Sequence, residues 1–263
     1  MGVRGEENQL TDIVGQWVLP GMVVLTASLL QSAVGFGYTL FLLPLLLVME
    51  YAPFEIVVVT AIVSSLAQRI FILTHLHRAV DWRTLVPMML IGLAAIPLGI
   101  CLLCQVSSQT QSTIKQIIGG CILLLLLLQW FGRVAPRDSI SRGWGYLAAF
   151  FSGLLTGFAN IGGPPMALWL LAHRWPNEKM RITIPTFSLA FVPVQLVMLL
   201  MIFGRPVLEA GGKAIIFTPA VLLGAWLGLR AGGKLNKQQL RLAVHLLLLA
   251  VAMIAILGSC FKG

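Results

Sequence analysis

Long apolar runs separated by short polar segments dominate the chain. The two longest runs, Trp17–Val48 and Gly145–Ala172, hold 32 and 28 residues, whereas a helix needs about 20 apolar residues to cross a bilayer. Each long run is followed by three runs of ordinary length, at about 56–74, 84–104 and 116–131 and then at about 182–203, 214–229 and 242–260. A polar lead covers residues 1–16. The pattern predicts an all-α integral membrane protein.

The composition points to the same class. Of the 263 residues, 58% are hydrophobic and 10% are charged, and the mean hydropathy is +0.93. Soluble domains carry about 25% charged residues, so a soluble fold is excluded. The net charge of +9 would suit nucleic-acid binding, but the basic residues lie in short loops, where the positive-inside rule explains them. We predict a single polytopic membrane domain over residues 1–263, with the lipid bilayer as its partner and no nucleic acid.

Both long runs contain a break in their helical pattern. Asn160-Ile161-Gly162-Gly163-Pro164-Pro165 interrupts the second run, and Gly35-Phe36-Gly37-Tyr38 interrupts the first. Proline is tolerated in the first turn of a new helix, so the pattern reads as helix, break, helix. Broken backbone at membrane depth must be buried in protein or line a watery cavity. The helix that starts at such a break turns free N–H groups and a positive dipole end toward it, which suits an anion.

The two halves of the chain repeat each other. Repeat 1 covers about 17–131, the polar connection 132–144, and repeat 2 about 145–260. Gly35-Phe36-Gly37 lies 125 residues before Asn160-Ile161-Gly162, Thr60 lies 126 before Thr186, and Pro87 and Gly92 lie 132 before Pro219 and Gly224. The shared order of elements carries more weight than any single match.

The distribution of Lys and Arg indicates the topology. If each long run crosses the membrane once, these residues split 9 against 8 between the two faces; if each run returns to the side it entered, they split 12 against 5. The positive-inside rule favours the second arrangement, with the twelve-charge face in the cytoplasm. We therefore predict two inverted repeats, each a broken or re-entrant helical hairpin plus three transmembrane helices. Both termini would be extracytoplasmic, and re-entrant hairpins or pairs of short full spans would fit equally well.

Neutral polar groups and glycines near the breaks are the candidate substrate-binding residues. They are Gln31, Ser32, Gly35, Phe36, Gly37, Tyr38 and Thr39 at the first break and Asn160, Ile161, Gly162 and Gly163 at the second, with Thr186 and Gln195 on a later span. Arg69, the charged residue within a predicted span, completes the set as an attractor of anions. Two simpler interpretations remain: the glycines permit close helix packing, and Arg69 extends to the lipid headgroups.

The remaining chemistry is restricted by what the spans lack. All nine carboxylates fall in the polar lead or in loops, which argues against a metal site and against a coupling proton or sodium ion held by a membrane acid. His245 near the start of the last span is an alternative proton site. Cys101 and Cys104 form an isolated C-x-x-C pair, interpreted as packing residues. We find no H-E-x-x-H and no pair of membrane carboxylates, so no enzyme activity, catalytic residue or cofactor is predicted.

With its two glycine-containing breaks opening similar halves, the chain resembles the TauE/SafE family of sulfite and organosulfonate exporters from about Trp17 to Gly258. The first break has Tyr38 and Thr39 where the family pattern suggests further glycine. The resemblance implies a secondary transporter in the cell inner membrane that exports sulfite, sulfoacetate or a related organosulfonate. Alternating access around the two breaks would be its mechanism. The residues alone also allow a carrier or channel for another small solute or ion, or a membrane assembly subunit without substrate. They give no oligomeric state.

Overall fold

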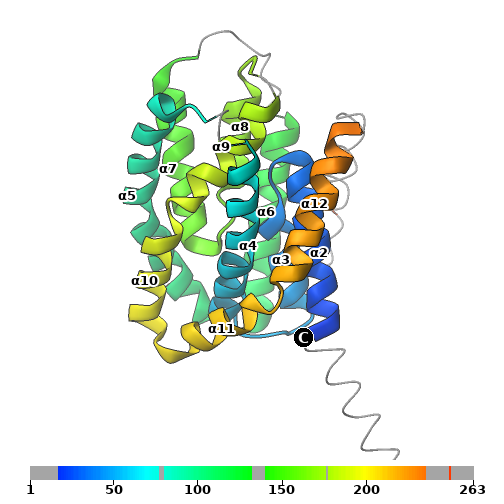
Figure 1. The fold of residues 1–263 in the computed structure, drawn as a ribbon. Helices are drawn as coiled ribbons and strands as arrows, with labels where there is room; N and C mark the ends of the chain where they lie inside the picture. The colour runs from blue at the N-terminus through cyan, green and yellow to red at the C-terminus, as the bar shows by residue number, and fades with distance from the viewer. Residues whose placement is uncertain (1–16, 77–79, 132–139, 176, 235–248, 250–263) are drawn as a thin grey trace, which may run out of the picture.

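The computed structural model describes residues 17–76, 80–131, 140–175, 177–234 and 249. This part of the chain is built from helices (Figure 1): α2 (Leu19–Val34), α3 (Tyr38–Val48), α4 (Phe54–Leu76), α5 (Trp82–Ser107), α6 (Gln111–Phe131), α7 (Arg142–Ala159), α8 (Gly163–Leu171), α9 (Asn177–Leu189), α10 (Val192–Phe203), α11 (Arg205–Ile215) and α12 (Thr218–Lys234). The predicted polar lead, His245 and all of the last span at 242–260 except residue 249 lie outside the described residues.

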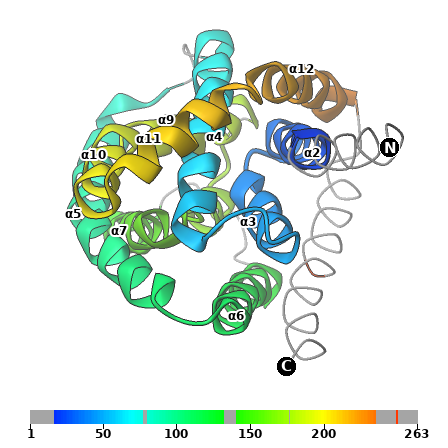
Figure 2. The same cartoon turned by 90° about the horizontal axis from the view of Figure 1, so that it is seen from below.

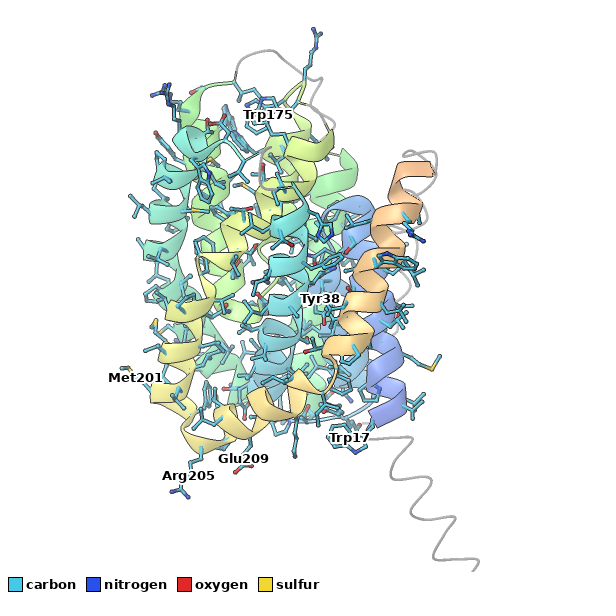
Figure 3. The ribbon with its side chains drawn as sticks, viewed as in Figure 1. Trp17, Tyr38, Trp175, Met201, Arg205 and Glu209 are labelled. Atoms are coloured by element: carbon cyan, nitrogen blue, oxygen red, sulfur yellow. The ribbon has the colours of Figure 1, made fainter. Side chains whose placement is uncertain are left out.

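Both long apolar runs form the predicted broken hairpins. In the first, α2 rises from the end of the molecule that carries Trp17, the chain turns near mid-height at Tyr38, and α3 runs back (Figures 1 and 3). In the second, α7 and α8 turn at Asn160, and α8 returns to the opposite end, which carries Trp175 (Figure 3). We call these the lower and the upper end. Each hairpin therefore starts and finishes at the same end of the molecule.

Three described helices are long and apolar enough to cross a membrane, namely Phe54–His75, Trp82–Ser107 and Gln111–Leu128. Two further pairs of described helices pass the same test jointly but are bent between their members. The structure is therefore that of a multi-pass membrane protein. Helix α4 is the most central of these spans, because it packs against α2, α3, α5, α9, α10, α11 and α12.

Two spans in the second half are bent. The span predicted at 182–203 corresponds to α9 and α10, which meet at a bend of 41°. Pro193 lies at the start of α10 and lacks the N–H that a continuous helix would need there. Residues 205–215, which come before the span predicted at 214–229, form helix α11, which meets α12 at 54°. Its buried side chains, Val207, Ala210 and Ala214, share one face at helical spacing.

Close backbone contact joins two pairs of helices, α5 with α7 and α2 with α12. Figure 2 shows one pair on either side of the molecule. A Cβ atom at Gly153 of α7 would overlap the backbone of Gly92 on α5, and a Cβ atom at Gly224 of α12 would overlap the carbonyl oxygen of Leu25 on α2. Small residues at such positions let membrane helices approach closely enough for dispersion forces to hold them. The glycines therefore have packing roles away from the breaks.

Ion pairs fasten the helix ends. Asp81 caps α5 and accepts a hydrogen bond of 2.9 Å from Lys179 at the start of α9. That bond lowers the pKa of the Asp81 carboxyl below its usual value. The turn between α3 and α4 carries Glu50, which accepts a bond of 3.1 Å from Lys115 of α6. These ion pairs hold loops in place at the ends of the helices. No carboxylate among the described residues is buried in the interior of the bundle.

Candidate functional site

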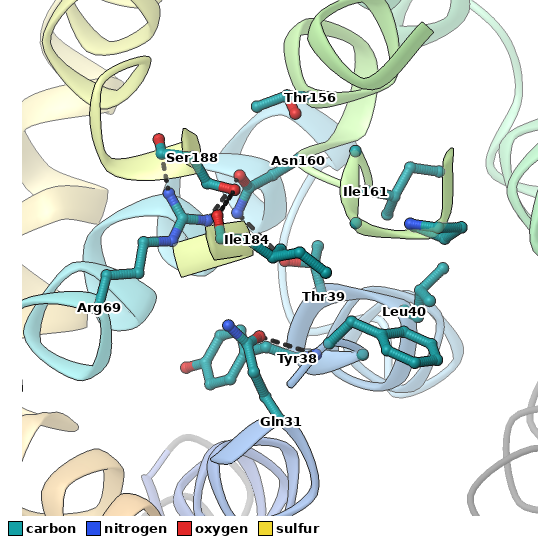
Figure 4. A pocket seen from close by; sticks show the side chains of 15 residues that line it. Gln31, Tyr38, Thr39, Leu40, Arg69, Thr156, Asn160, Ile161, Ile184 and Ser188 are labelled. Atoms are coloured by element: carbon teal, nitrogen blue, oxygen red, sulfur yellow. Dashed lines mark hydrogen bonds between the residues drawn. The ribbon is translucent and has the colours of Figure 1, made fainter. Parts of the chain in front are cut away.

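A cavity of about 30 Å³ lies where the two helix breaks face each other. The first hairpin, the second hairpin, α4 and α9 all contribute to its walls (Figure 4). Its lining consists of Gln31, Phe36, Gly37, Tyr38, Thr39, Leu40, Arg69, Thr156, Asn160, Ile161, Gly162, Gly163, Pro164, Ile184 and Ser188. Broken backbone at membrane depth is tolerated where it is buried in protein or lines a cavity, and here it lines one.

The first break depends on the backbone freedom of glycine. Helix α2 ends at Gly35 with φ of 101°, and α3 begins after Gly37 with φ of 112°, values that side chains with a Cβ rarely adopt. The Gln31 side chain accepts a hydrogen bond of 3.1 Å from the Tyr38 N–H. The remaining N–H groups of the first turn of α3 have no acceptor within the helix, and two of them belong to Thr39 and Leu40, which line the cavity.

The second break is built differently. Asn160 ends α7 in the left-handed region with φ of 56°, which Asn tolerates better than most residues. Gly162 has an ordinary φ of −71° and accepts a hydrogen bond from the Ser152 hydroxyl through its carbonyl. Because Pro164 and Pro165 have no N–H, the start of α8 offers fewer donors than the start of α3. Gly163 supplies the N–H at the first helical position.

Arg69 joins the two breaks to the rest of the bundle. Its Nη2 donates to Asn160 Oδ1 at 3.0 Å, and its Nη1 donates to the Ser188 carbonyl at 3.3 Å. Asn160 Nδ2 in turn donates to Thr39 Oγ1 at 3.1 Å, so a side-chain hydrogen bond connects the second hairpin to the first (Figure 4). Arg69 is 5% exposed. The interpretation that it extends to the lipid headgroups is therefore wrong.

The Arg69 guanidinium is a buried cation with neutral partners. Its Nε has no hydrogen-bond partner among the described residues, and no described carboxylate pairs with it. Removing a charge from water costs several kcal/mol unless an opposite charge or strong hydrogen bonds offset it. The described residues also contain no group of three or more His, Cys, Asp and Glu side chains that could hold a metal ion. The local chemistry suits an anion.

The structure brings together ten of the predicted site residues at the cavity: Gln31, Phe36, Gly37, Tyr38, Thr39, Arg69, Asn160, Ile161, Gly162 and Gly163. The other four lie outside its lining. Ser32 accepts a hydrogen bond from Gln68 at 2.8 Å, and Gln195 donates to the Thr156 carbonyl at 2.6 Å. The buried Thr186 hydroxyl has no partner among the described residues, and Gly35 ends α2. Ser32 and Gln195 brace helices that carry lining residues.

Sequence reasoning left out five lining residues: Leu40, Thr156, Pro164, Ile184 and Ser188. Helical spacing could have found one of them, because Thr156 lies four residues before Asn160, the residue that ends α7. The Ser188 carbonyl is different. It lies in the last turn of α9, where carbonyls lose their intrahelical donors, and the bend that creates this end was not predicted.

Comparison with known proteins shows the family. The family model for sulfite exporter TauE/SafE matches residues 21–254, which is most of the chain. The chain belongs to this family. It is also 25% identical over 203 residues, 76% of this chain and 78% of the other, to a probable sulfite/organosulfonate exporter TauE from Cupriavidus necator. No solved structure matches the chain. This TauE/SafE protein is a membrane transporter and not an enzyme.

Proposed function

We propose that this protein exports a small sulfur oxyanion, such as sulfite, sulfoacetate or a related organosulfonate, across the cell inner membrane by alternating access around its two helix breaks. The buried Arg69 in the cavity between the breaks is the observation that carries this proposal. Its cost of burial is offset when an anion binds, so the site favours occupation by an anion. The family and the relative's name supply the substrate class.

The helix packing supports two inverted repeats. If α2–α6 correspond to α7–α12 and the last span, the repeat relates α5 to α12 and α7 to α2. The two closely packed pairs, α5 with α7 and α2 with α12, are then exchanged by the repeat. The hairpins enter from opposite ends of the molecule (Figure 1), as an inversion requires. On this reading the upper end, with Arg83, Arg142, Arg174 and Lys179 beside it, faces the cytoplasm, and both termini are extracytoplasmic.

The hydrogen bond between Asn160 and Thr39 gives alternating access a physical basis. It holds the two hairpin tips together across the cavity, with Arg69 attached to the same amide. When a substrate anion takes the donors of Arg69, the amide loses one of its two partners and the tips can separate. The membrane potential can drive the cycle, because expelling a monoanion from an inside-negative cell gains about 2.3 kcal/mol per 100 mV.

Flux in proteoliposomes tests the proposal. The purified chain is reconstituted, radiolabelled sulfite, sulfoacetate and thiosulfate are supplied, and the potential is clamped at opposite signs. We expect flux of at least one of these anions, with a direction that follows the potential. Flux that requires a pH gradient instead would introduce a coupling proton and direct attention to His245. The absence of flux for all three would refute the proposed substrate class.

Arg69→Gln gives the residue-level prediction. Losing charged hydrogen bonds of about 1.5–3 kcal/mol raises the anion concentration for half-maximal flux by about tenfold to a hundredfold. Expression should stay close to that of the wild type, because glutamine removes a buried charge. The matched control is Arg205→Gln, which removes a charge at the lower end in α11 (Figure 3). If flux depends on the anion concentration in the same way in the wild type and in Arg69→Gln, Arg69 does not bind the anion.

A further inference from the structure

The cavity between the breaks contains a single formal charge among the described residues that line it. Arg69 supplies that charge, and the other lining residues are glycine, proline, apolar or neutral polar residues. Its partners are the amide of Asn160 and the carbonyl of Ser188, both uncharged. The side-chain charge available to a bound anion in this part of the chain is therefore one positive unit.

The helix dipoles add little net charge to the single positive charge of Arg69. A helix start contributes about half a positive charge and a helix end about half a negative charge. At the first break the end of α2 lies beside the start of α3, and at the second break the end of α7 lies beside the start of α8. Each break thus brings opposite dipole ends together, and their fields largely offset each other at the cavity. The N–H groups near the breaks provide direction and hydrogen bonds with little net charge.

We infer that the site selects singly charged sulfur oxyanions over doubly charged ones, which means hydrogensulfite rather than sulfite dianion, and sulfonates without a second acid group rather than sulfoacetate, disulfonates or sulfate. This inference rests on the proposed function and narrows its substrate class. One buried cation neutralises one negative charge; a second would lie in a low-dielectric cavity without a counter-charge, which disfavours the charged form strongly. The cavity of about 30 Å³ also favours a small anion.

Competition in proteoliposomes tests the inference. Sulfite takes up a proton near neutral pH, so its monoanion fraction falls as the pH rises, whereas methanesulfonate stays a monoanion and sulfate stays a dianion. Sulfite uptake is measured at a fixed total concentration, with equal pH inside and outside, from mildly acidic to mildly alkaline pH, with empty vesicles subtracted. We expect uptake to fall in step with the hydrogensulfite fraction, methanesulfonate to compete at every pH, and sulfate to compete at least tenfold less well.

The results that would overturn this inference differ from the result that would overturn the proposed function. Uptake that is constant or rises with pH, or sulfate that competes as well as methanesulfonate, overturns the inference while leaving anion transport in place. Failure of every sulfur anion to cross would instead contradict the proposed function.

A charge-neutralising variant provides a second test. Asn160→Asp places a carboxylate at the position that accepts from Arg69 at 3.0 Å, with little change in size and with a residue that also tolerates left-handed backbone. The net charge of the lining then falls to zero, and we expect methanesulfonate binding to weaken by roughly a hundredfold. Gln105→Glu is the matched amide-to-acid control, because Gln105 lies in α5 outside the cavity lining. Unchanged methanesulfonate affinity in Asn160→Asp would also overturn the inference.

Discussion

The two helix breaks perform the same task with different chemistry. At the first break, a Cβ at Gly37 would find open space within 4 Å, but its φ of 112° excludes most side chains. At the second, Gly162 has an ordinary φ of −71°, but a Cβ there would overlap the Ser152 carbonyl and the Thr156 hydroxyl. Glycine is needed for its dihedral angle in one case and for its small volume in the other. Two breaks that look alike in the sequence therefore need glycine for different physical reasons.

The polar groups at the breaks differ in the same way. The first break satisfies one of its own backbone groups locally, because the Gln31 side chain accepts from the Tyr38 N–H. The second uses Asn160 to reach across the cavity to Arg69 and Thr39. We therefore expect substitutions at the second break to affect the coupling between hairpins, and substitutions at the first to affect mainly the stability of its own turn.

The largest effect is expected for Gly162→Ala. The added methyl group overlaps backbone atoms of α7, which cannot rotate away as a side chain could, so α7 and α8 must separate at a cost of about 3 kcal/mol. Anion flux should be lost while the protein still inserts into the membrane. The measurement is flux in proteoliposomes normalised to inserted protein. Gly212→Ala, at an α11 position with open space around it, is the control. Wild-type flux in Gly162→Ala would show that the tight contact at the second break has no importance for transport.

Asn160→Ala should come next. It removes the acceptor for Arg69 and the donor for Thr39, and it puts alanine in the left-handed region at an extra cost of about 1–2 kcal/mol. Asn160→Gly separates these effects, because glycine keeps the backbone conformation and loses the hydrogen bonds. We expect both variants to lose most of their flux and the glycine variant to be the more stable one, measured by chemical unfolding in detergent. Normal flux in Asn160→Gly would mean that the bridge between the hairpins is dispensable.

The sequence predicted the hairpins well because Gly, Pro and Asn act on the local backbone. Both breaks, at Gly35–Gly37 and at Asn160–Gly162, lie where these residues interrupt the helical backbone. The bend between α9 and α10 escaped prediction, since Pro193 sits in an otherwise continuous apolar run and proline alone does not settle whether a membrane helix bends there. Arg69 could be identified as a charged residue at membrane depth, but its partners depend on tertiary packing. The Ser188 carbonyl reaches it because α9 ends early.

A smaller effect is expected for Gly37→Ala. No atom obstructs the new methyl group, so the cost comes from the backbone alone, about 1–3 kcal/mol for a residue held at a positive φ. Flux should fall partially, and less than in Gly162→Ala. Gly37→Asn is the informative companion, because asparagine tolerates positive φ better than alanine and should recover part of the stability. If both Gly37 variants lose stability equally, steric crowding and not dihedral strain governs the first break.

The smallest effect is expected for Gln31→Met. The change keeps the length of the side chain and removes the acceptor of the Tyr38 N–H, a hydrogen bond worth about 1 kcal/mol. Because Gln31 and Tyr38 both line the cavity, water there can take over part of the lost bond. Thr26→Ala is the control, since the exposed Thr26 hydroxyl bonds only backbone carbonyls of its own helix among the described residues. If Gln31→Met loses as much flux as Asn160→Gly, the first break also couples the two hairpins. The two breaks would then not differ in this respect.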